Sequence, residues 1–473
     1  MNTGRLVLPA LRWREETGFH HEQPAIDAAL AYGAGGFILF GGTDDGVVEL
    51  TDRLIAAAGR PLLIASDLER GAGQQMRGLS ELPPPRALAS LHDPAVVRGA
   101  GILTAVEALS VGINWVLAPV ADLDIEPENP IVQTRAFGGD AETVAAAVAA
   151  WVVGCEAAGA MACVKHFPGH GRTRTDSHMG TPVVEASREL LEETDLLPFR
   201  AAIGAGVSSV MTAHVAFPAL DPTGTPATFS KPILDVLRQD WGFDGLIVTD
   251  ALMMEGASAG RSAGQIGLGA LRAGVDLLLY PNEPVAVAEA LARAAAEDAG
   301  VAARIEESLR RYDTALRVTA SEGRPERLPP SGAAMATSDW LLSGPLLRGV
   351  APRLTTPIEL VIVDDDQGTP WPVSPNTWVG EALAQKGVPL GPGGSKVILA
   401  FAEPRASKGR SGFSSANAAR LAEEGKTAAL TVLFTHPRLV ASLKSRGPVL
   451  HAWHRQRLMQ EAVARWIAGH IER

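Results

Sequence analysis

The sequence predicts an α/β chain in which a (β/α)₈ barrel of the TIM type is followed by a smaller α/β domain. Short apolar runs rich in Val, Ile and Leu alternate with Ala-, Leu-, Glu- and Arg-rich stretches of helical character. Several runs are continuously apolar, as expected for parallel strands that are buried on both faces. Eight such runs precede residue 281, which is the strand number of the barrel. A doubly wound open sheet is the alternative, and periodicity alone does not separate the two.

The expected barrel elements follow one another in regular alternation. The eight expected strands are Arg5–Leu11, Gly36–Phe40, Pro61–Ser66, Ile113–Pro119, Met161–Lys165, Ser208–Ala213, Leu246–Thr249 and Val275–Tyr280. The helices expected between the later strands are Asp140–Ala158, Ser187–Gly204, Pro232–Asp240 and Gly264–Ala273. An amphipathic helix at Val301–Val318 then closes the unit, so we expect the barrel to occupy residues 1–320 and to be irregular at its start.

A second α/β pattern follows a breaker. The stretch SEGRPERLPPSG predicts irregular structure and a linker at 321–356. An accessory α/β domain is expected at 357–473. Its expected strands are Ile358–Val363, Val397–Phe401 and Ala428–Phe434, and its expected helices are Ala416–Glu424 and Gln456–Ile471.

Composition excludes several classes of partner. The net charge is −11 and no run of Lys or Arg offers a stripe for phosphates, so we expect no nucleic-acid partner. The two cysteines, Cys155 and Cys163, are too few for a disulfide framework. With no uninterrupted apolar span of about 20 residues and no signal-peptide pattern, we expect no membrane partner and a cytoplasmic location. The oligomeric state is left open.

Ionisable residues recur at one end of the apolar runs. In a barrel the carboxyl ends of all strands converge on one pocket, which is where catalytic groups lie. The residues that follow the third to seventh runs are Asp67 and Glu69, then Asp122, then Lys165 and His166, then His214, and finally Asp250. The pattern predicts an active site at this end of the barrel.

The loop Lys165–His178, KHFPGHGRTRTDSH, carries the most information. Gly169 and Gly171 allow a tight backbone path. Asp176 and His178 are close enough for the carboxylate to bind one imidazole nitrogen and favour the protonated ring, which makes His178 a candidate proton donor. The alternative is that Asp176 only braces a turn.

The segment Gly242–Met254, GFDGLIVTDALMM, ends an apolar strand at Asp250 with no basic neighbour in the sequence. A carboxylate there is costly unless it is solvated or used, and one that faces a sugar can attack the anomeric carbon. The alternative role of Asp250 is to cap the following helix.

These motifs resemble glycoside hydrolase family 3, and most closely its bacterial β-N-acetylglucosaminidase branch. The resemblance extends from about Gly35 to Tyr280 and includes KHFPGHG, DSH and GFDGLIVTDALMM. The other matching stretches are ILF (Ile38–Phe40), SDLERGAG (Ser66–Gly73), VGINWVLAPVADL (Val111–Leu123), NPIVQTRAFG (Asn129–Gly138), MTAHVAFPALD (Met211–Asp221) and ATFS (Ala227–Ser230).

The resemblance implies a role for each matching residue. Asp250 corresponds to the nucleophile, His178 to the acid/base and Asp176 to its carboxylate partner. The residues implied to bind the sugar are Asp67, Arg135, Lys165, His166, His214 and Met254. The implied substrate carries a terminal β-linked N-acetylglucosamine, often from recycled peptidoglycan, and is hydrolysed with retained configuration. Neither a metal nor another cofactor is implied.

Three alternatives remain open at this point. Within the family, the enzyme could be a β-glucosidase, a β-xylosidase or a phosphorylase. A metal-dependent hydrolase would use ligands drawn from His166, His170, Asp176 and His178. A sugar-binding protein without turnover is the third alternative, because Ala251 replaces a second Asp that is common in the family and DLERGAG replaces the common DQEGG.

Overall fold

The structure, a computed structural model, describes residues 2–174, 181–254, 260–319, 324–326, 332–344, 347–366, 373–403, 410–443 and 447–472. The chain divides into two units. The first consists of Met1–Ser80, His92–Glu126 and Ala136–Pro330, and the second of Glu81–Leu91, Pro127–Arg135 and Ser331–Arg473.

The first unit is built on parallel strands. Seven of them form one sheet in chain order, and each is hydrogen-bonded to the next in parallel. They are β2 (Ala10–Arg12), β3 (Gly36–Phe40), β4 (Leu63–Ser66), β5 (Trp115–Val116), β6 (Met161–Phe167), β7 (Ser209–Thr212) and β8 (Leu246–Thr249). Nearly every strand residue is buried, as the continuous apolar runs predict.

Two short strands close this sheet into a barrel. β1 (Val7–Leu8) pairs in parallel with β9 (Leu278–Leu279), and a parallel bridge between Val248 and Leu277 joins β9 to β8. Pro9 alone separates β1 from β2, so the first strand of the barrel is interrupted at a residue that cannot donate a backbone hydrogen bond. All eight predicted strands are present, and the prediction of a barrel with an irregular start is confirmed.

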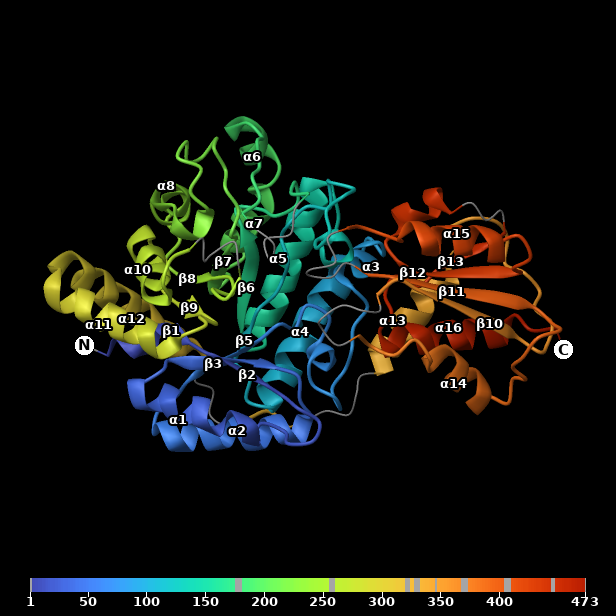
Figure 1. Cartoon of the computed structure of the whole chain (residues 1–473), viewed down its shortest axis with the longest axis horizontal. Coiled ribbons are helices and arrows are strands. Elements are labelled where there is room, and N and C mark those ends of the chain that lie inside the picture. The colour runs from blue at the N-terminus through green and yellow to red at the C-terminus, as the bar shows by residue number, and fades with distance from the viewer. Residues whose placement is uncertain are drawn as a thin grey trace. The chain divides into compact units, whose positions relative to one another are not determined.

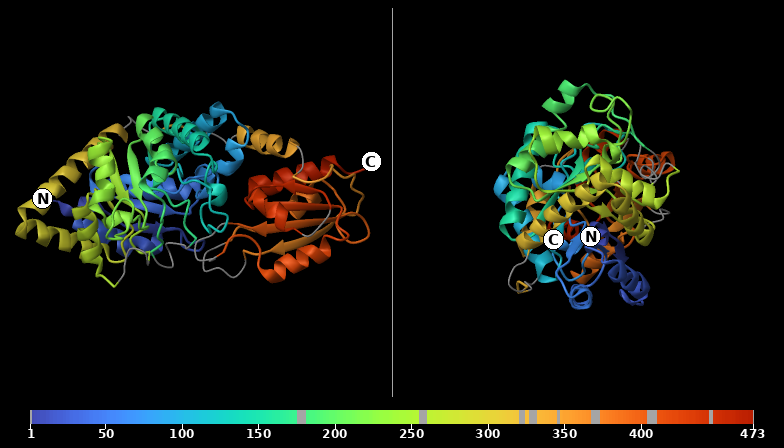
Figure 2. Two further views of the ribbon diagram at one scale, coloured as in Figure 1. Left: turned by 90° about the horizontal axis from the view of Figure 1, so that it is seen from above. Right: turned by 90° about the vertical axis from the view of Figure 1, so that its left-hand side faces the viewer.

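Helices follow the strands and surround the barrel (Figures 1 and 2). In this unit they are α1 (Gln23–Tyr32), α2 (Asp44–Ala58), α4 (Pro94–Ser110), α5 (Ala141–Ala157), α6 (Arg188–Glu193), α7 (Leu197–Gly204), α8 (Lys231–Asp235), α10 (Ala263–Ala273), α11 (Pro284–Glu297) and α12 (Ala299–Thr319). Side-chain caps start several of them: Thr43 accepts from the Gly46 N–H at 3.1 Å and Asp140 from the Thr143 N–H at 2.9 Å.

Two predicted helices are broken in the structure. The helix expected at Ser187–Gly204 is divided into α6 and α7, because Pro198 lacks an N–H and begins a new helix in its first turn. The helix expected at Pro232–Asp240 starts as α8 and continues as the π-helical turn η6 (Val236–Asp240).

The second unit is a three-layer α/β fold. Its sheet has four parallel strands in the order β10 (Glu359–Asp364), β11 (Lys396–Ala402), β12 (Leu430–Thr435) and β13 (Val449–His451). Helices α14 (Trp378–Gln385) and α16 (Arg457–Gly469) cover one face and α15 (Ser415–Glu424) the other (Figure 1). Along β11, Leu399 packs into the core on the first face and Ile398 into the core on the second. The predicted accessory α/β domain is therefore present.

Parts of the second unit differ from the sequence prediction. Irregular structure was expected over 321–356, but Gly332–Ser343 form helix α13, whose Leu342 packs into the core shared with α14 and α16. Strand β13 and helix α14 were not predicted. Short apolar segments such as Val449–His451 carry too little periodicity to be assigned before their neighbours in the sheet are known.

No helix within the described residues is long and apolar enough to cross a membrane.

Candidate active site

The residues predicted at the strand ends lie where the barrel rule places them. Asp67 directly follows β4, and Lys165 and His166 are near the carboxyl end of β6. His214 follows β7, and Asp250 directly follows β8. Because parallel strands of one barrel end on the same side, these residues share its carboxyl end.

A buried lysine joins two carboxylates from the β4 loop. Lys165 Nζ lies 2.7 Å from Asp67 Oδ1 and 2.8 Å from Glu69 Oε1, and the lysine side chain is only 2% exposed. Burying an ammonium group is costly unless it is paired, and both carboxylates supply that pairing. The Asp67 side chain remains 29% exposed, so it can meet a ligand as well as Lys165.

A second buried carboxylate organises the loop after β6. Asp122 is fully buried; its Oδ2 lies 2.7 Å from His166 Nδ1, while its Oδ1 accepts from the backbone N–H of His170 at 2.6 Å. Burial alone would raise the pKa of Asp122, but the charges of and hydrogen bonds from His166 and His170 hold it below its usual value. Asp122 is therefore ionised at neutral pH.

The glycines of this loop allow the close approach that the sequence predicts. Gly169 has a φ of +136°, which side chains rarely tolerate. A Cβ atom on Gly171 would lie 2.1 Å from the Leu123 carbonyl oxygen. Only glycine at 171 lets the loop pack against the segment that carries Asp122.

The segment after Asp250 is held by its main chain. The Ala251 N–H donates to Asp250 Oδ1 at 2.7 Å, and His214 Nε2 donates to the Ala251 carbonyl at 3.2 Å. His214 Nδ1 lies 2.8 Å from the Thr228 hydroxyl, and Met254 is buried nearby in sequence with its N–H bound to the Ala251 carbonyl. Position 251 supports Asp250 without using a side chain, which explains how alanine is accommodated there.

Electrostatic interactions connect Asp250 with both clusters. Burial raises the pKa of the Cys163 thiol to about 12, and that pKa also responds to the charges of Lys165, Asp67 and Asp250. Burial lowers the pKa of His170 to about 4, so this ring is neutral at pH 7, and its pKa responds to Asp122 and Asp250. The main chain joins Asp250 to the same side of the sheet, because its N–H donates to the Thr212 carbonyl at 3.3 Å at the end of β7, and β7 pairs with β6, which carries Lys165 and His166.

The described contacts do not test the roles of three predicted site residues. Asp176 and His178, the predicted acid/base pair, lie outside the described residues. Arg135 belongs to the second unit, where it ends the short helix η4 (Gln133–Arg135) and donates to the Ile131 carbonyl at 3.2 Å. The roles of all three stay predictions.

The metal-dependent alternative gains no support from the described part of the chain. No group of three or more His, Cys, Asp or Glu side chains there could hold a metal ion. Of the ligands considered for that alternative, His166 is bound to Asp122, and the ring of His170 lies 2.6 Å from the Thr173 hydroxyl.

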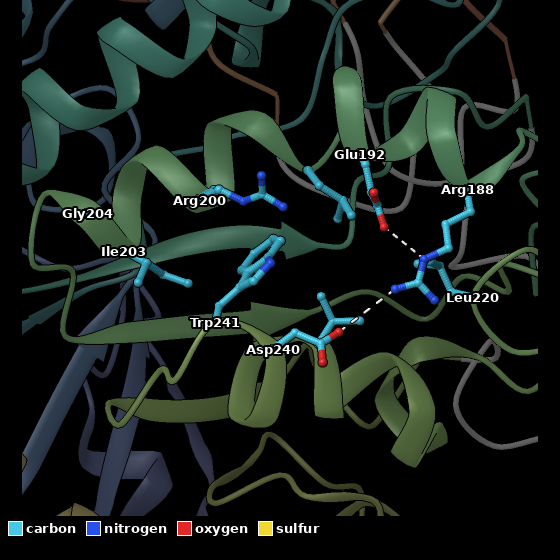
Figure 3. Close-up of a pocket in the computed structure, with 10 residues that line it drawn as sticks. Arg188, Glu192, Arg200, Ile203, Gly204, Leu220, Asp240 and Trp241 are labelled. Carbon is cyan, nitrogen blue, oxygen red and sulfur yellow. Dashed lines mark hydrogen bonds and ion pairs between the residues drawn. The ribbon is translucent and has the colours of Figure 1, made fainter.

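A separate cavity of about 580 Å³ lies beside α6, α7 and η6 (Figure 3). Arg188 is paired there with Glu192 at 2.8 Å and lies 3.9 Å from Asp240, and the Arg200 guanidinium stacks over the Trp241 ring at 5.1 Å. Its lining includes none of the strand-end residues, and its charged groups pair with one another. We therefore place the candidate active site at the strand ends.

Comparisons with known proteins identify the family of the barrel unit. Residues 27–315 match the Glycosyl hydrolase family 3 N terminal domain, which covers the barrel strands from β3 to β9. A protein named Beta-hexosaminidase from Nitrosomonas eutropha is 37% identical over 268 residues, which are 54% of this chain and 76% of that protein.

Two solved structures resemble this one. A glycoside hydrolase family 3 beta-N-acetylglucosaminidase from Paenibacillus sp. str. FPU-7 has a TM-score of 0.84 and 27% identity, covering 100% of this chain and 96% of that one. A Beta-N-acetylhexosaminidase from Beutenbergia cavernae has a TM-score of 0.60 and 31% identity, covering 67% of this chain and 97% of the other. The first likeness extends over both units.

Proposed function

This chain is a glycoside hydrolase that belongs to glycosyl hydrolase family 3, and on that premise we propose that it removes terminal β-linked N-acetylglucosamine with retention of configuration. The observation that carries the proposal is the arrangement at the barrel mouth. A half-buried carboxylate, Asp250, directly follows β8, and β6, two strands away in the same parallel sheet, carries the buried ammonium group of Lys165 and the oriented imidazole of His166. The relatives named for N-acetylhexosamine substrates support the choice of sugar.

The proposed first step forms a covalent glycosyl-enzyme. Asp250 attacks the anomeric carbon, and His178, oriented by Asp176, protonates the departing glycosidic oxygen. In the second step His178 removes a proton from water, which attacks the anomeric carbon and releases Asp250. Two inversions at one carbon leave the configuration as it was.

The remaining proposed residues hold the sugar. Lys165 supplies a charge-assisted donor to hydroxyl groups, and the partly exposed carboxylate of Asp67 can accept from them. We assign Arg135, His166, His214 and Met254 to the same pocket on their match to the family pattern. The pairing of Lys165 with Asp67 and Glu69 keeps the donor in place before substrate arrives.

The decisive experiment compares aryl glycosides that differ only at the 2-position. The N-acetylglucosaminide should be cleaved with a higher kcat/KM than the glucoside and the xyloside. A preference for the 2-hydroxyl sugars would replace the proposed glycone, and release that depends on added phosphate would indicate a phosphorylase. No release of aryl alcohol from any substrate would favour a binding protein. Disaccharides from peptidoglycan, tested next, would show whether wall fragments are natural substrates.

The proposed acid is tested by its dependence on the leaving group. His178→Ala should slow cleavage of unactivated disaccharides far more than cleavage of nitrophenyl glycosides, whose leaving groups need little protonation. We expect a difference of about 10²-fold between the two substrate types. Equal losses on both types would remove His178 from this role.

A further inference from the structure

Asp122 lies beneath His166 and is bound to it twice. Its Oδ2 is 2.7 Å from His166 Nδ1, and its Oδ1 accepts from the His166 backbone N–H at 3.2 Å. The segments are also joined by the main chain, since the Ala121 N–H donates to the Lys165 carbonyl at 2.6 Å. The carboxylate thus receives a main-chain and a ring hydrogen bond from one residue.

The chemistry of these contacts sets the tautomer of His166. An ionised carboxylate can only accept, so the proton on Nδ1 must belong to the imidazole. The second nitrogen, Nε2, has no hydrogen bond to any described residue, although the His166 side chain is only 8% exposed. A buried ring with one nitrogen anchored and the other open is suited to meeting a polar ligand group.

The neighbouring histidine is held differently. His170 donates only its backbone N–H to Asp122, and its ring lies 2.6 Å from the Thr173 hydroxyl. The ring bond to Asp122 is therefore particular to His166. Asp122 accepts two main-chain hydrogen bonds, from His166 and His170, and one from the His166 ring. The main-chain bonds can order the loop, whereas the ring bond can act on the chemistry, so experiments can separate the two roles.

The geometry points to Asp122 as a positioning residue of the reaction, which fixes His166 with Nδ1–H on the carboxylate and Nε2 open to the sugar. This inference rests on the proposed function, in which His166 binds a sugar hydroxyl. A neutral ring in this tautomer accepts the hydroxyl proton at Nε2, and a protonated ring donates from the same atom. Asp122 acts only through His166 and does not touch the substrate.

A double-mutant cycle tests that dependence. In Asp122→Asn the amide oxygen can still accept from the backbone, but an NH₂ group at the Oδ2 position opposes Nδ1–H and favours the other tautomer. We expect kcat/KM to fall on the order of 10²-fold in the wild-type background and by less than about threefold in a His166→Gln background. Multiplicative losses would show that Asp122 is a scaffold, and would overturn the inference.

Asp195 provides a matched control. It is a buried carboxylate that anchors the same loop through Arg172, with Nε 2.8 Å from Oδ2, and it has no contact with His166 among the described residues. Asp195→Asn should therefore combine multiplicatively with His166→Gln. If Asp195→Asn couples to His166 as strongly as Asp122→Asn does, the coupling reflects loop order, and the specific role is lost.

A measurement without activity separates this inference from the proposed function. In protein carrying ¹⁵N-labelled histidine, the His166 signal, assigned by its loss in His166→Gln, should report a protonated Nδ1 at pH 7.5. In Asp122→Asn the proton should move to Nε2. An unprotonated Nδ1 in the wild type overturns the inference even if every glycoside is cleaved. Failure to cleave any glycoside would remove the proposed function and leave the tautomer result standing. If Asp122→Asn does not fold, the wild-type spectrum decides.

Discussion

Both units of this chain gather carboxylates at the carboxyl ends of parallel strands, but they satisfy them in opposite ways. In the barrel, Asp67 and Asp250 follow β4 and β8 and keep part of their surface exposed. In the second unit, Asp364 to Asp366 end or follow β10 and Glu403 follows β11, and the side chains of all four are at most 7% exposed.

The second unit supplies its own cation to this edge. The Arg455 side chain is 1% exposed and donates to Asp364 at 3.1 and 2.9 Å and to Asp366 at 2.8 Å. Its backbone N–H binds Glu403 at 2.8 Å, and its Nε binds the Ser374 carbonyl at 2.9 Å. Arg455 thus neutralises two of the carboxylates at the carboxyl end of this sheet.

The contrast teaches that carboxylates at strand ends do not by themselves define an active site. In the barrel, Lys165 pairs with Asp67 but leaves that carboxylate 29% exposed, and the imidazole of His166 keeps one open nitrogen. In the second unit the corresponding carboxylates are paired within the fold: Asp364 and Asp366 with Arg455, Asp365 with Arg410, and Glu403 with His454. We therefore expect substitutions to affect activity at the first edge and stability at the second.

The strongest test of this division is Asp250→Ala. Removing the proposed nucleophile should lower kcat by at least about 10⁴-fold, while the melting temperature changes little, because the Asp250 side chain is only half-buried. Steady-state kinetics and thermal unfolding provide the two readouts. Asp244→Ala, in a turn where the side chain is 93% exposed, is the control and should keep activity within about twofold. Substantial turnover in Asp250→Ala would remove its assigned role.

The opposite result is expected at the edge of the second sheet. Arg455→Met leaves Asp364 and Asp366 buried without their cation and should destabilise the unit by about 3–5 kcal/mol. Denaturant unfolding measures this loss. Arg457→Met removes an arginine that is 63% exposed and pairs with Glu461, and should cost less than about 1 kcal/mol. Equal costs for the two variants would contradict the contrast between a buried ion pair and an exposed one.

Acid should distinguish the units through their buried histidines. Burial lowers the pKa of His436 and of His451 in the second unit to about 3, and that of His170 in the barrel to about 4. Since these pKa values lie below the ordinary histidine pKa of about 6.5, the stability that depends on the neutral rings is fully present above about pH 6.5. That stability is lost as pH falls towards 4, at up to about 1.4 kcal/mol per pH unit for each histidine.

The second unit contains two of these histidines, so its backbone amides should lose protection from hydrogen exchange faster on acidification. Hydrogen exchange at pH 7 and pH 5, corrected for intrinsic rates, should show a larger loss in peptides from β12 than in peptides from β6. His451→Gln should reduce the difference, whereas His20→Gln, at an exposed position, should not. A greater loss in the barrel would contradict this assignment of the acid-sensitive groups.

The smallest expected effect concerns the pairing of Lys165. Glu69→Gln keeps the shape of the side chain but removes one of two negative charges beside the ammonium group. Lys165 should then pair more strongly with Asp67, so that this carboxylate binds the sugar hydroxyls less well. We therefore expect a higher KM and a loss of about tenfold in kcat/KM. Initial rates measured over a range of substrate concentrations separate KM from kcat. A change in melting temperature without a change in KM would make Glu69 a purely structural partner.

Much of the barrel could be predicted from local sequence. Continuous apolar runs identified every strand, and Gly169 and Gly171 indicated the tight loop, because these signals reside in the residues themselves. The breaks in two helices and the short elements of the second unit were missed. Pro198 tolerates either the interior of a kinked helix or the first turn of a new one, and the three-residue strand β13 is defined only by its pairing with β12.

The sequence by itself determined the alternation of strands and helices and the kinds of ionisable residue at the strand ends, since both depend on local patterns. Only the tertiary structure decided which of those residues pair: Lys165 with Asp67 and Glu69, His166 with Asp122, and Arg455 with Asp364 and Asp366. The partners are separated by 44 to 98 residues. Packing sets the distance and burial of each pair, and these determine whether a charge is neutralised within the fold or left to meet a substrate.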